Sequence, residues 1–93
     1  MTVQNNDLTI LPNIGKVLAG KLKLVEIDTV EKLQSIGSEN TFIRLKTLDN
    51  DVCFNMLCAL EGAIQGIRWH NLEKCKKEEL RIFYEMTKQT DTK

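Results

Sequence analysis

Apolar residues recur along the chain at the spacings of an α-helix, and the alternation typical of a strand is absent. The clearest example lies between residues 14 and 25, where the lysines fall mostly outside an apolar stripe. The stripe consists of Ile14, Val17, Leu18, Leu22 and Val25. The pattern predicts an amphipathic helix in this segment and an all-α fold for the chain.

Two shorter helices are predicted between residues 28 and 48. Asp28 is expected to cap the first of them, which ends at Gly37, because an acid follows three positions after the cap. Ser38 is expected to cap the second, which ends in the polar turn at residues 49–51.

The segment with the most apolar residues, 52–66, predicts a helix that is apolar nearly all round and therefore buried at the centre of the bundle. Asp51 is expected to cap it. Gly62 is expected to mark a close helix crossing, and Gly66 to end the helix. A last helix with a mixed-charge outer face is expected to begin near Asn71.

These elements make a compact bundle of about five short helices, predicted as a single domain over residues 1–93 with an ordered core of about 8–88. Such short helices have difficulty burying all the large apolar side chains of the second half. These are Phe54, Met56, Leu57, Leu60, Ile64, Trp69, Ile82, Phe83, Tyr84 and Met86. Small domains often recover stability by association, so a homodimer or an unknown protein partner is expected.

Four of these large side chains are candidate packing or interface anchors. They are Met56, Leu60, Trp69 and Phe83. Trp69 follows a helix that ends in glycine and is expected to pack between the last two helices. Glu61, within the otherwise apolar helix, is expected to pair with Arg68 or another base.

Charge is balanced at 13 basic and 13 acidic residues, with six of each through residue 50 and seven of each after it. Neither half therefore carries a field that would attract nucleic acid, and any such contact would need a local patch. The N-terminus lacks the pattern of a signal or transit peptide, and no apolar run is long enough to span a membrane. A cytoplasmic protein without membrane contact is expected.

No arrangement of residues predicts catalysis, a metal site or a cofactor. The one His and the three Cys lack the spacing of a zinc site, and reduced core thiols are expected instead. No nucleophile and base pair, phosphate-cradling glycine loop or spaced carboxylate pair is present, so the chain is not expected to be an enzyme.

The local feature with the clearest chemistry is the turn Leu11-Pro12-Asn13-Ile14-Gly15-Lys16. It resembles the turn of helix-hairpin-helix modules, in which free amides at the start of the second helix can bind one phosphate oxygen. The candidate phosphate or DNA contacts are Asn13, Gly15, Lys16 and Lys23. Where such hairpins prefer glycine this chain has Asn13, whose side chain stands where a nucleic-acid backbone would approach.

The resemblance extends beyond the turn. The segments Asn13-Ile14-Gly15, Glu26-Ile27-Asp28-Thr29-Val30-Glu31-Lys32-Leu33, Ser35-Ile36-Gly37 and Leu45-Lys46 precede the block Leu57-Cys58-Ala59-Leu60-Glu61-Gly62-Ala63-Ile64-Gln65-Gly66 and Trp69. Together they resemble the C-terminal domain of the TfoX family of competence regulators, over about residues 8–80.

The resemblance implies an all-helical domain with a helix-hairpin-helix-like core (SAM/HhH type), associated with the regulation of natural DNA transformation. TfoX-like regulators also carry an N-terminal domain, for which this chain has no room. The leading hypothesis is a non-enzymatic regulatory domain that acts through protein-protein contacts. The alternative is a weak, sequence-non-specific DNA-binding module that uses the hairpin amides.

Overall fold

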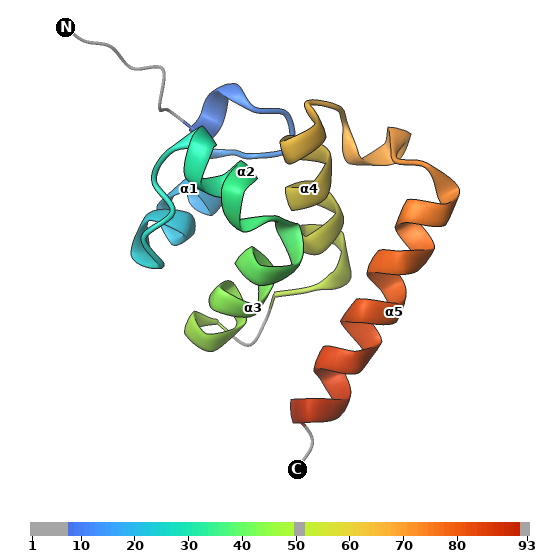
Figure 1. Ribbon diagram of the computed structural model, residues 1–93. Helices are drawn as coiled ribbons and strands as arrows, with labels where there is room; N and C mark the ends of the chain where they lie inside the picture. Colours follow the sequence, from blue (N-terminus) through green and yellow to red (C-terminus); the bar gives the residue numbers. More distant parts are fainter. Residues whose placement is uncertain (1–7, 50–51, 92–93) are drawn as a thin grey trace, which may run out of the picture.

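The computed structural model describes residues 8–49 and 52–91, with side chains through Lys88. Within these residues all regular structure is helical, which confirms the predicted all-α class (Figure 1). Two short 3-10 turns accompany the α-helices. The elements are η1 (Leu8–Ile10), α1 (Lys16–Leu24), α2 (Val30–Ile36), α3 (Ser38–Leu48), α4 (Phe54–Gln65), η2 (Trp69–Asn71) and α5 (Lys74–Asp91).

The start of α2 is one residue later than the sequence predicts. Thr29 is the N-cap, and its hydroxyl oxygen accepts a hydrogen bond from the Lys32 amide at 3.0 Å. Asp28, the expected cap, instead forms an ion pair with the Lys32 ammonium at 3.1 Å. The i, i+4 spacing places the two charges on the same side of the first turn.

Gly37 and Gly66 end α2 and α4, as expected, and both have positive φ, at 88° and 79°. After Gly37 the chain enters α3 at once. The expected cap of α3, Ser38, is its first helical residue and does not cap it, because its hydroxyl donates to the Glu61 carboxylate at 2.6 Å. Asp51, the expected cap of α4, lies outside the described residues.

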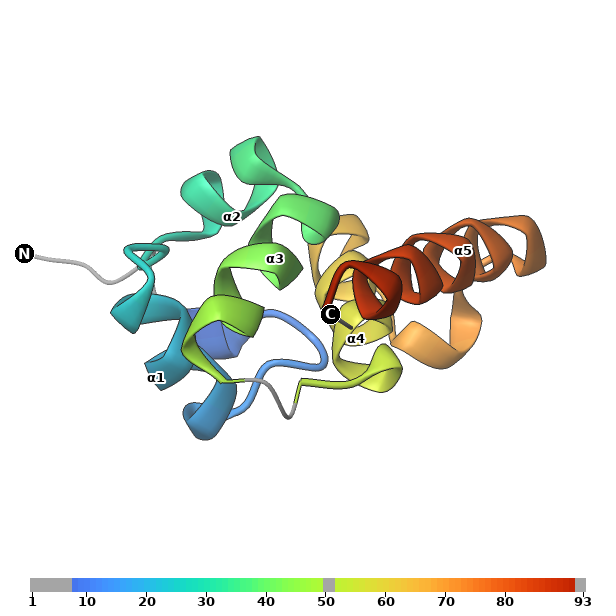
Figure 2. The same ribbon diagram turned by 90° about the horizontal axis from the view of Figure 1, so that it is seen from below.

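The helix α4 lies at the centre of the bundle, as its sequence predicts. It contacts α3 on one side and α5 and η2 on another (Figures 1 and 2). The buried apolar side chains of the core come from η1, from every α-helix and from the segments between them: Leu8, Ile14, Ala19, Leu22, Ile27, Leu33, Phe42, Leu45, Val52, Leu57, Cys58, Leu60, Ala63, Leu72 and Leu80. Burial of this set is the main favourable contribution to folding.

The last helix, α5, lies along one side of α4 and faces the start of α3, while α1 lies at the opposite end of the molecule (Figures 1 and 2). The ring of Tyr84 in α5 contacts aromatic rings of both α3 and α4. It meets Phe42 of α3 edge to face, with ring centroids 5.9 Å apart, and Phe54 of α4 at 5.7 Å. Leu80, one turn earlier in α5, is fully buried.

The inward face of α1 differs in one position from the predicted stripe. Val17 is 75% exposed, while Ala19 is buried and Leu22 is fully so. The helix begins only at Lys16, and its packed side is centred on the line from Ala19 to Leu22. Val17 lies on the opposite side of the helix from Ala19 and Leu22, so its side chain points away from the core.

Candidate functional site

Asn13, the first candidate contact residue of the hairpin, has an unusual backbone conformation. Its φ is 71°, in the left-handed region that asparagine adopts more readily than most residues other than glycine. The residue thus provides the turn between η1 and α1. Unlike glycine, it also has an amide side chain that needs partners when half-buried.

The hydrogen-bond partners of the Asn13 amide are distant from it in the sequence. Its Nδ2 donates to the carbonyl of Ile67 at 2.9 Å and, more weakly, to that of Ala59 at 3.4 Å. Its Oδ1 accepts from the amide of Trp69 at 3.2 Å. We call this set of bonds the Asn13 latch, because it ties the hairpin to the corner between α4 and η2.

Gly62 makes room for the latch. A Cβ at this position would lie 2.6 Å from Nδ2 of Asn13, 2.8 Å from the Ile67 carbonyl and 3.1 Å from Cα of Trp69. These distances are shorter than van der Waals contact allows, and two of the atoms belong to the backbone. The close helix crossing expected at Gly62 is therefore wrong: the close approach is to the side chain of Asn13 and to the backbone of residues 67–69, and no second α-helix takes part in it.

The other three hairpin candidates remain on the surface. Gly15 is the N-cap of α1, and no side chain caps the helix. The first helical bond runs from the Ala19 amide to the Gly15 carbonyl at 2.9 Å, so the amides of residues 16–18 precede it. Lys16 and Lys23 are exposed. They are seven positions apart, which places them on one side of α1.

Lys21, also on α1, is held elsewhere. Its ammonium lies 2.7 Å from the Asp49 carboxylate, and both side chains are about 30% exposed. This ion pair fastens the end of α3 to α1. The cationic surface of α1 that faces solvent is therefore made by Lys16 and Lys23.

Trp69 lies in the connection that leads from α4 to α5, where it is half-buried and packs against the core. Its ring stacks on that of His70, with centroids 4.3 Å apart and planes 26° from parallel. The His70 carbonyl accepts from the Lys77 ammonium at 3.1 Å. The residues that bond to Asn13 are thus held in place by the packing of Trp69 on the core, by its stacking on His70 and by the bond from Lys77 to the His70 carbonyl.

The remaining candidate anchors occupy different depths. Leu60 is fully buried in α4, so its contacts lie within the core. Met56 of α4 is half-buried and packs against this core. Phe83 of α5 is also half-buried, and it is the anchor that borders an open surface depression.

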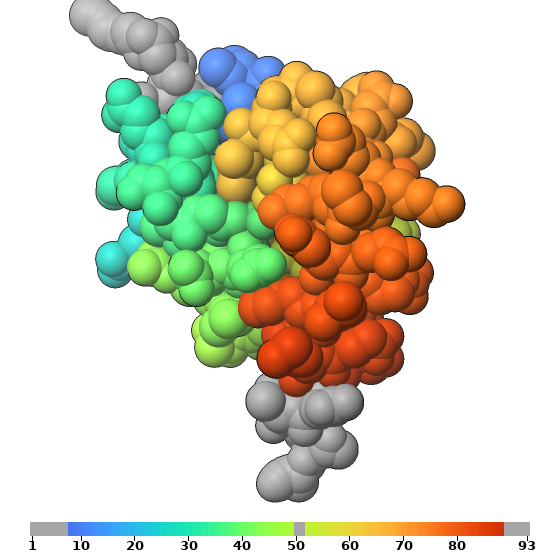
Figure 3. Space-filling view, turned by 45° about the vertical axis from the view of Figure 1, so that its right-hand side comes forward, coloured from blue at the N-terminus to red at the C-terminus, as the bar shows by residue number. Residues whose placement is uncertain are grey.

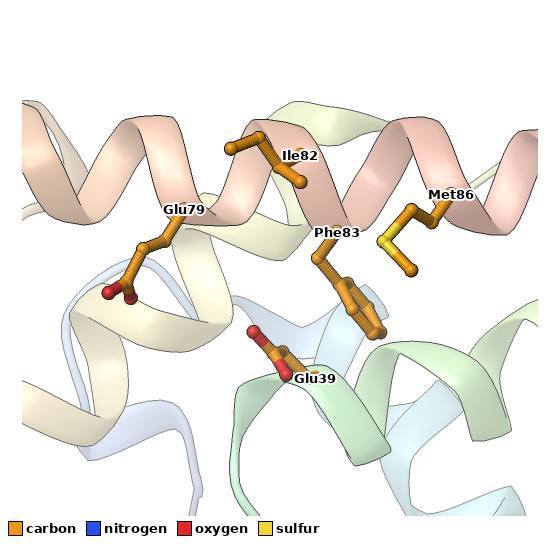
Figure 4. A pocket seen from close by; sticks show the side chains of 5 residues that line it. All are labelled: Glu39, Glu79, Ile82, Phe83 and Met86. Atoms are coloured by element: carbon orange, nitrogen blue, oxygen red, sulfur yellow. The ribbon is translucent and has the colours of Figure 1, made fainter.

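The depression lies where α5 meets the start of α3, and we call it the α5 groove. It has a volume of about 290 Å³, and it is lined by Glu39, Glu79, Ile82, Phe83 and Met86. Phe83 and Met86 point from α5 toward α3, Glu39 reaches up from α3, and Ile82 lies along the outward side of α5 (Figure 4). Figure 3 shows the seam between the two segments on the molecular surface.

Ile82 and Met86 are large apolar side chains that remain exposed to solvent, at 62% and 57%. Acidic residues surround Ile82 on the helix. Its neighbours three and four positions away are Glu78, Glu79, Glu85 and Met86. The exposed face of α5 is therefore an aliphatic patch framed by three carboxylates.

Glu61 joins three helices beneath this face. It accepts from the Ser38 hydroxyl at 2.6 Å and from the Gln65 amide at 2.7 Å. The base that it faces is Lys76 of α5, at 3.9 Å, which meets the expectation of a basic partner with a residue other than Arg68.

Lys76 also contacts Glu79, one of the residues that line the groove. It forms a second ion pair with Glu79 at 3.2 Å. This hydrogen bond is the main cause of a raised Lys76 pKa, and the charges of Glu61 and Glu39 add to it. Both glutamates that line the groove, Glu39 and Glu79, therefore act on the Lys76 ammonium.

Side chains that carry reactive chemistry are dispersed. Among the described residues, no three of the His, Cys, Asp and Glu side chains come together as metal ligands would. Cys58 is buried, as a core thiol should be, and burial raises its pKa. The expectation of core thiols is wrong for Cys53 and Cys75, which are both exposed. Within the same residues, no helix is both long and apolar enough to cross a membrane.

The groove combines one residue that the sequence singled out as an anchor with four that it did not. A signal for them exists in the surplus of large apolar side chains, which includes Ile82 and Met86. Helical spacing alone does not reveal that Glu39, more than forty positions away, forms the opposite wall.

Comparisons with known proteins agree with the fold. Residues 4–84 match the model of the TfoX C-terminal domain. The chain is 47% identical to an uncharacterized protein from Listeria monocytogenes, solved in a triclinic crystal form, with a TM-score of 0.86 over 87% of this chain and 92% of that one. A protein of unknown function from the same organism, in a tetragonal form, gives 48% identity and a TM-score of 0.84 over 86% and 98% of the two chains.

No functionally curated protein matches the chain significantly. The family match covers most of the sequence, including the hairpin with Asn13, the α4 block with Gly62, and Trp69. These are the residues that form the latch and the space around it. The chain belongs to the TfoX C-terminal domain family.

Proposed function

We propose that the chain is a non-enzymatic regulatory domain that acts through protein-protein contacts, and that the α5 groove is its contact surface. The observation that carries the proposal is the exposure of Ile82 and Met86, at 62% and 57%, beside the half-buried ring of Phe83. Contiguous exposed apolar side chains with a polar rim are typical of interaction sites.

The family supplies the context of this proposal. The resemblance implies a link to the regulation of natural DNA transformation, and we place the domain in the cytoplasm as part of that regulation. The partner is either a second copy of the chain, which would give the expected homodimer, or another protein.

The test compares three forms of the immobilised domain: the wild type, the double variant Ile82→Ser/Met86→Ser, and the control Leu48→Ser. Leu48 is 46% exposed on α3 and does not line the groove. The proposal expects the groove variant to retain its protein partner at least tenfold more weakly. Loss of Leu48 should leave retention unchanged.

Self-association is measured in parallel by sedimentation of the three purified forms. Equal retention and equal sedimentation by the wild type and the groove variant would contradict the proposal. A partner that both Leu48→Ser and the groove variant release would also contradict it, since the contact would then lie elsewhere.

A second candidate, weak and sequence-non-specific DNA binding, is favoured by the start of α1. The amides of residues 16–18 have no side-chain cap, and Lys16 stands beside them. Because the Asn13 amide is bonded inward to Ile67 and Trp69, it does not project from the turn toward a phosphate. The contacts in this candidate are therefore the amides after Gly15 together with Lys16 and Lys23.

Random duplex DNA titrated at increasing salt tests this candidate. Binding should fall steeply with salt and fall further in Lys16→Glu, while Lys74→Glu on α5 serves as the charge-matched control. No detectable binding at low salt would eliminate the DNA-binding candidate.

A further inference from the structure

A second exposed apolar surface lies on α1. Val17 and Leu24 are 75% and 70% exposed, and their spacing of seven positions places both on one line along the helix. Gly20 lies near the same line and is exposed, and Lys16 and Lys23 flank it. We call these five residues the α1 ridge.

The α1 ridge and the α5 groove have opposite charge. The helix α1 has the sequence KVLAGKLKL, with three lysines and no acid. Since Lys21 is paired with Asp49, the charge at the ridge comes from Lys16 and Lys23. The groove, by contrast, is lined by two glutamates.

At the groove, Lys76 offsets part of the charge of Glu79. Glu39 has no ion-pair partner among the described residues. Glu78 and Glu85 add to the negative potential beside Ile82. An aliphatic partner with one or two cations at its edge would satisfy both the apolar floor and the acidic rim of the groove.

This charge distribution opposes a two-fold contact through either surface. A two-fold axis that passes through one of these patches places that patch against its own copy. Groove against groove would bring the carboxylates of Glu39 and Glu79 near those of the partner, and ridge against ridge would do the same for Lys16 and Lys23. Ridge against groove joins apolar to apolar and cation to anion.

The two surfaces cannot meet within one chain. The helices α1 and α5 lie at opposite ends of the molecule in both orientations, along a body 47 Å in its longest dimension (Figures 1 and 2). A contact between ridge and groove therefore requires two copies.

We propose that the α1 ridge of one copy docks in the α5 groove of a second copy. Val17 and Leu24 lie against Ile82, Phe83 and Met86, and the ridge lysines face the groove glutamates. The inference rests on the proposed function of the groove and names its occupant. Because the contact is head to tail, a bound pair still offers one free ridge on one copy and one free groove on the other, and the assembly extends or closes into a ring.

The experiment uses two complementary variants of the full chain. The ridge variant, Lys16→Glu/Val17→Ser, keeps an intact groove. The groove variant, Glu39→Lys/Ile82→Ser, keeps an intact ridge. All four side chains are exposed, so both variants are expected to fold, and far-UV circular dichroism verifies it.

Sedimentation velocity is measured from tens of micromolar to about one millimolar, a range suited to weak contacts. Wild type should form species larger than a dimer as concentration rises. Each variant alone should be monomeric, with at least a tenfold weaker association constant. An equimolar mixture of the two should form a 1:1 dimer and nothing larger, because only one ridge and one groove remain functional in each pair.

The control Glu31→Lys/Leu48→Ser makes the same types of change on exposed positions of α2 and α3 and should associate as the wild type does. A wild type that stays monomeric throughout overturns the inference. So does a ridge variant that still dimerises alone, which would indicate a two-fold contact through the groove. So does retention by the ridge of random duplex DNA in place of a second copy.

These results separate the occupant from the proposed function. If wild-type chains do not self-associate but the groove still binds another protein, the inference fails and the proposed function stands. If the groove variant changes neither self-association nor the retention of another protein, both fail.

Discussion

Asn13 combines two properties that are rarely needed together, a left-handed backbone and a side chain with three hydrogen-bond partners. Glycine would satisfy the backbone without the bonds, and alanine would satisfy neither. The position was singled out from the sequence because it departs from the glycine of helix-hairpin-helix turns. Its partners could not be predicted, since they are backbone groups that any residue type supplies.

Asn13→Ala is expected to destabilise the domain by about 2–4 kcal/mol, because it strains the backbone and leaves half-buried groups at Ile67 and Trp69 without their bonds. Asn13→Gly relieves the strain and should cost about 1–2 kcal/mol less than the alanine variant. Urea denaturation measures both. A glycine variant as stable as the wild type would show that the latch contributes nothing.

Gly62→Ala is expected to destabilise by about 2–4 kcal/mol, although alanine favours helices, because its Cβ would press on the latch. Gly20 provides the matched control: a Cβ there meets nothing within 4 Å. Gly20→Ala should therefore stabilise the domain by about 0.5–1 kcal/mol. Effects of the same sign in both variants would contradict the steric explanation.

At the scale of single elements, the sequence predicts helices better than their caps. The apolar period locates α1 to α5, and Gly37 and Gly66 mark two ends. Thr29 and Asp28 are both good caps by type, and the register of the first turn decides between them. Ser38 was expected to cap α3, and its contact with Glu61 depends on how α3 packs against α4, which local sequence does not determine.

The ion pair at the start of α2 makes a prediction about pH. The hydrogen bond and charge of Lys32 hold the pKa of Asp28 below its usual value. A carboxylate with a lowered pKa in the folded state stabilises it above the pKa of the unfolded chain, and this contribution disappears as pH falls through the lowered value. Asp28→Asn should therefore be less stable than the wild type at pH 7 and equally stable well below about pH 4.

Chemical denaturation of both forms at several pH values measures this difference. Added salt at pH 7 should reduce it, because the pair is exposed. A difference that persists unchanged at acid pH would assign it to the shape of the side chain and not to its charge.

At the scale of the molecule, the positions of the two exposed apolar surfaces depend on the whole fold. The surplus of apolar residues indicates that some side chains stay exposed. Which ones do so follows from the angle at which α5 lies on α4 and from the short contact it makes with α3 (Figure 1). Val17 was expected inside and is outside, while the ring of Phe83 borders the groove.

Substitutions on the two sides of α5 should therefore differ in effect. Leu80→Ala removes a fully buried side chain and is expected to cost about 2–4 kcal/mol. Ile82→Ser, on the exposed face, should change the free energy of unfolding by less than about 0.5 kcal/mol at concentrations where the chain is monomeric. Thermal or urea unfolding measures both, and a cost for Ile82→Ser close to that of Leu80→Ala would place its side chain in the core.

The Asn13 latch is also expected to affect the rates of folding and unfolding differently. Its bonds join residues 46, 54 and 56 positions apart, so they close a loop of about half the chain. Closing such a loop costs entropy before the bonds form, whereas the helices need only local contacts. The latch is therefore expected to form after the folding barrier, so that Asn13→Gly speeds unfolding in stopped-flow traces and leaves the folding rate nearly unchanged. Asn13 would then determine how long the folded domain lasts and have little influence on how quickly it is reached.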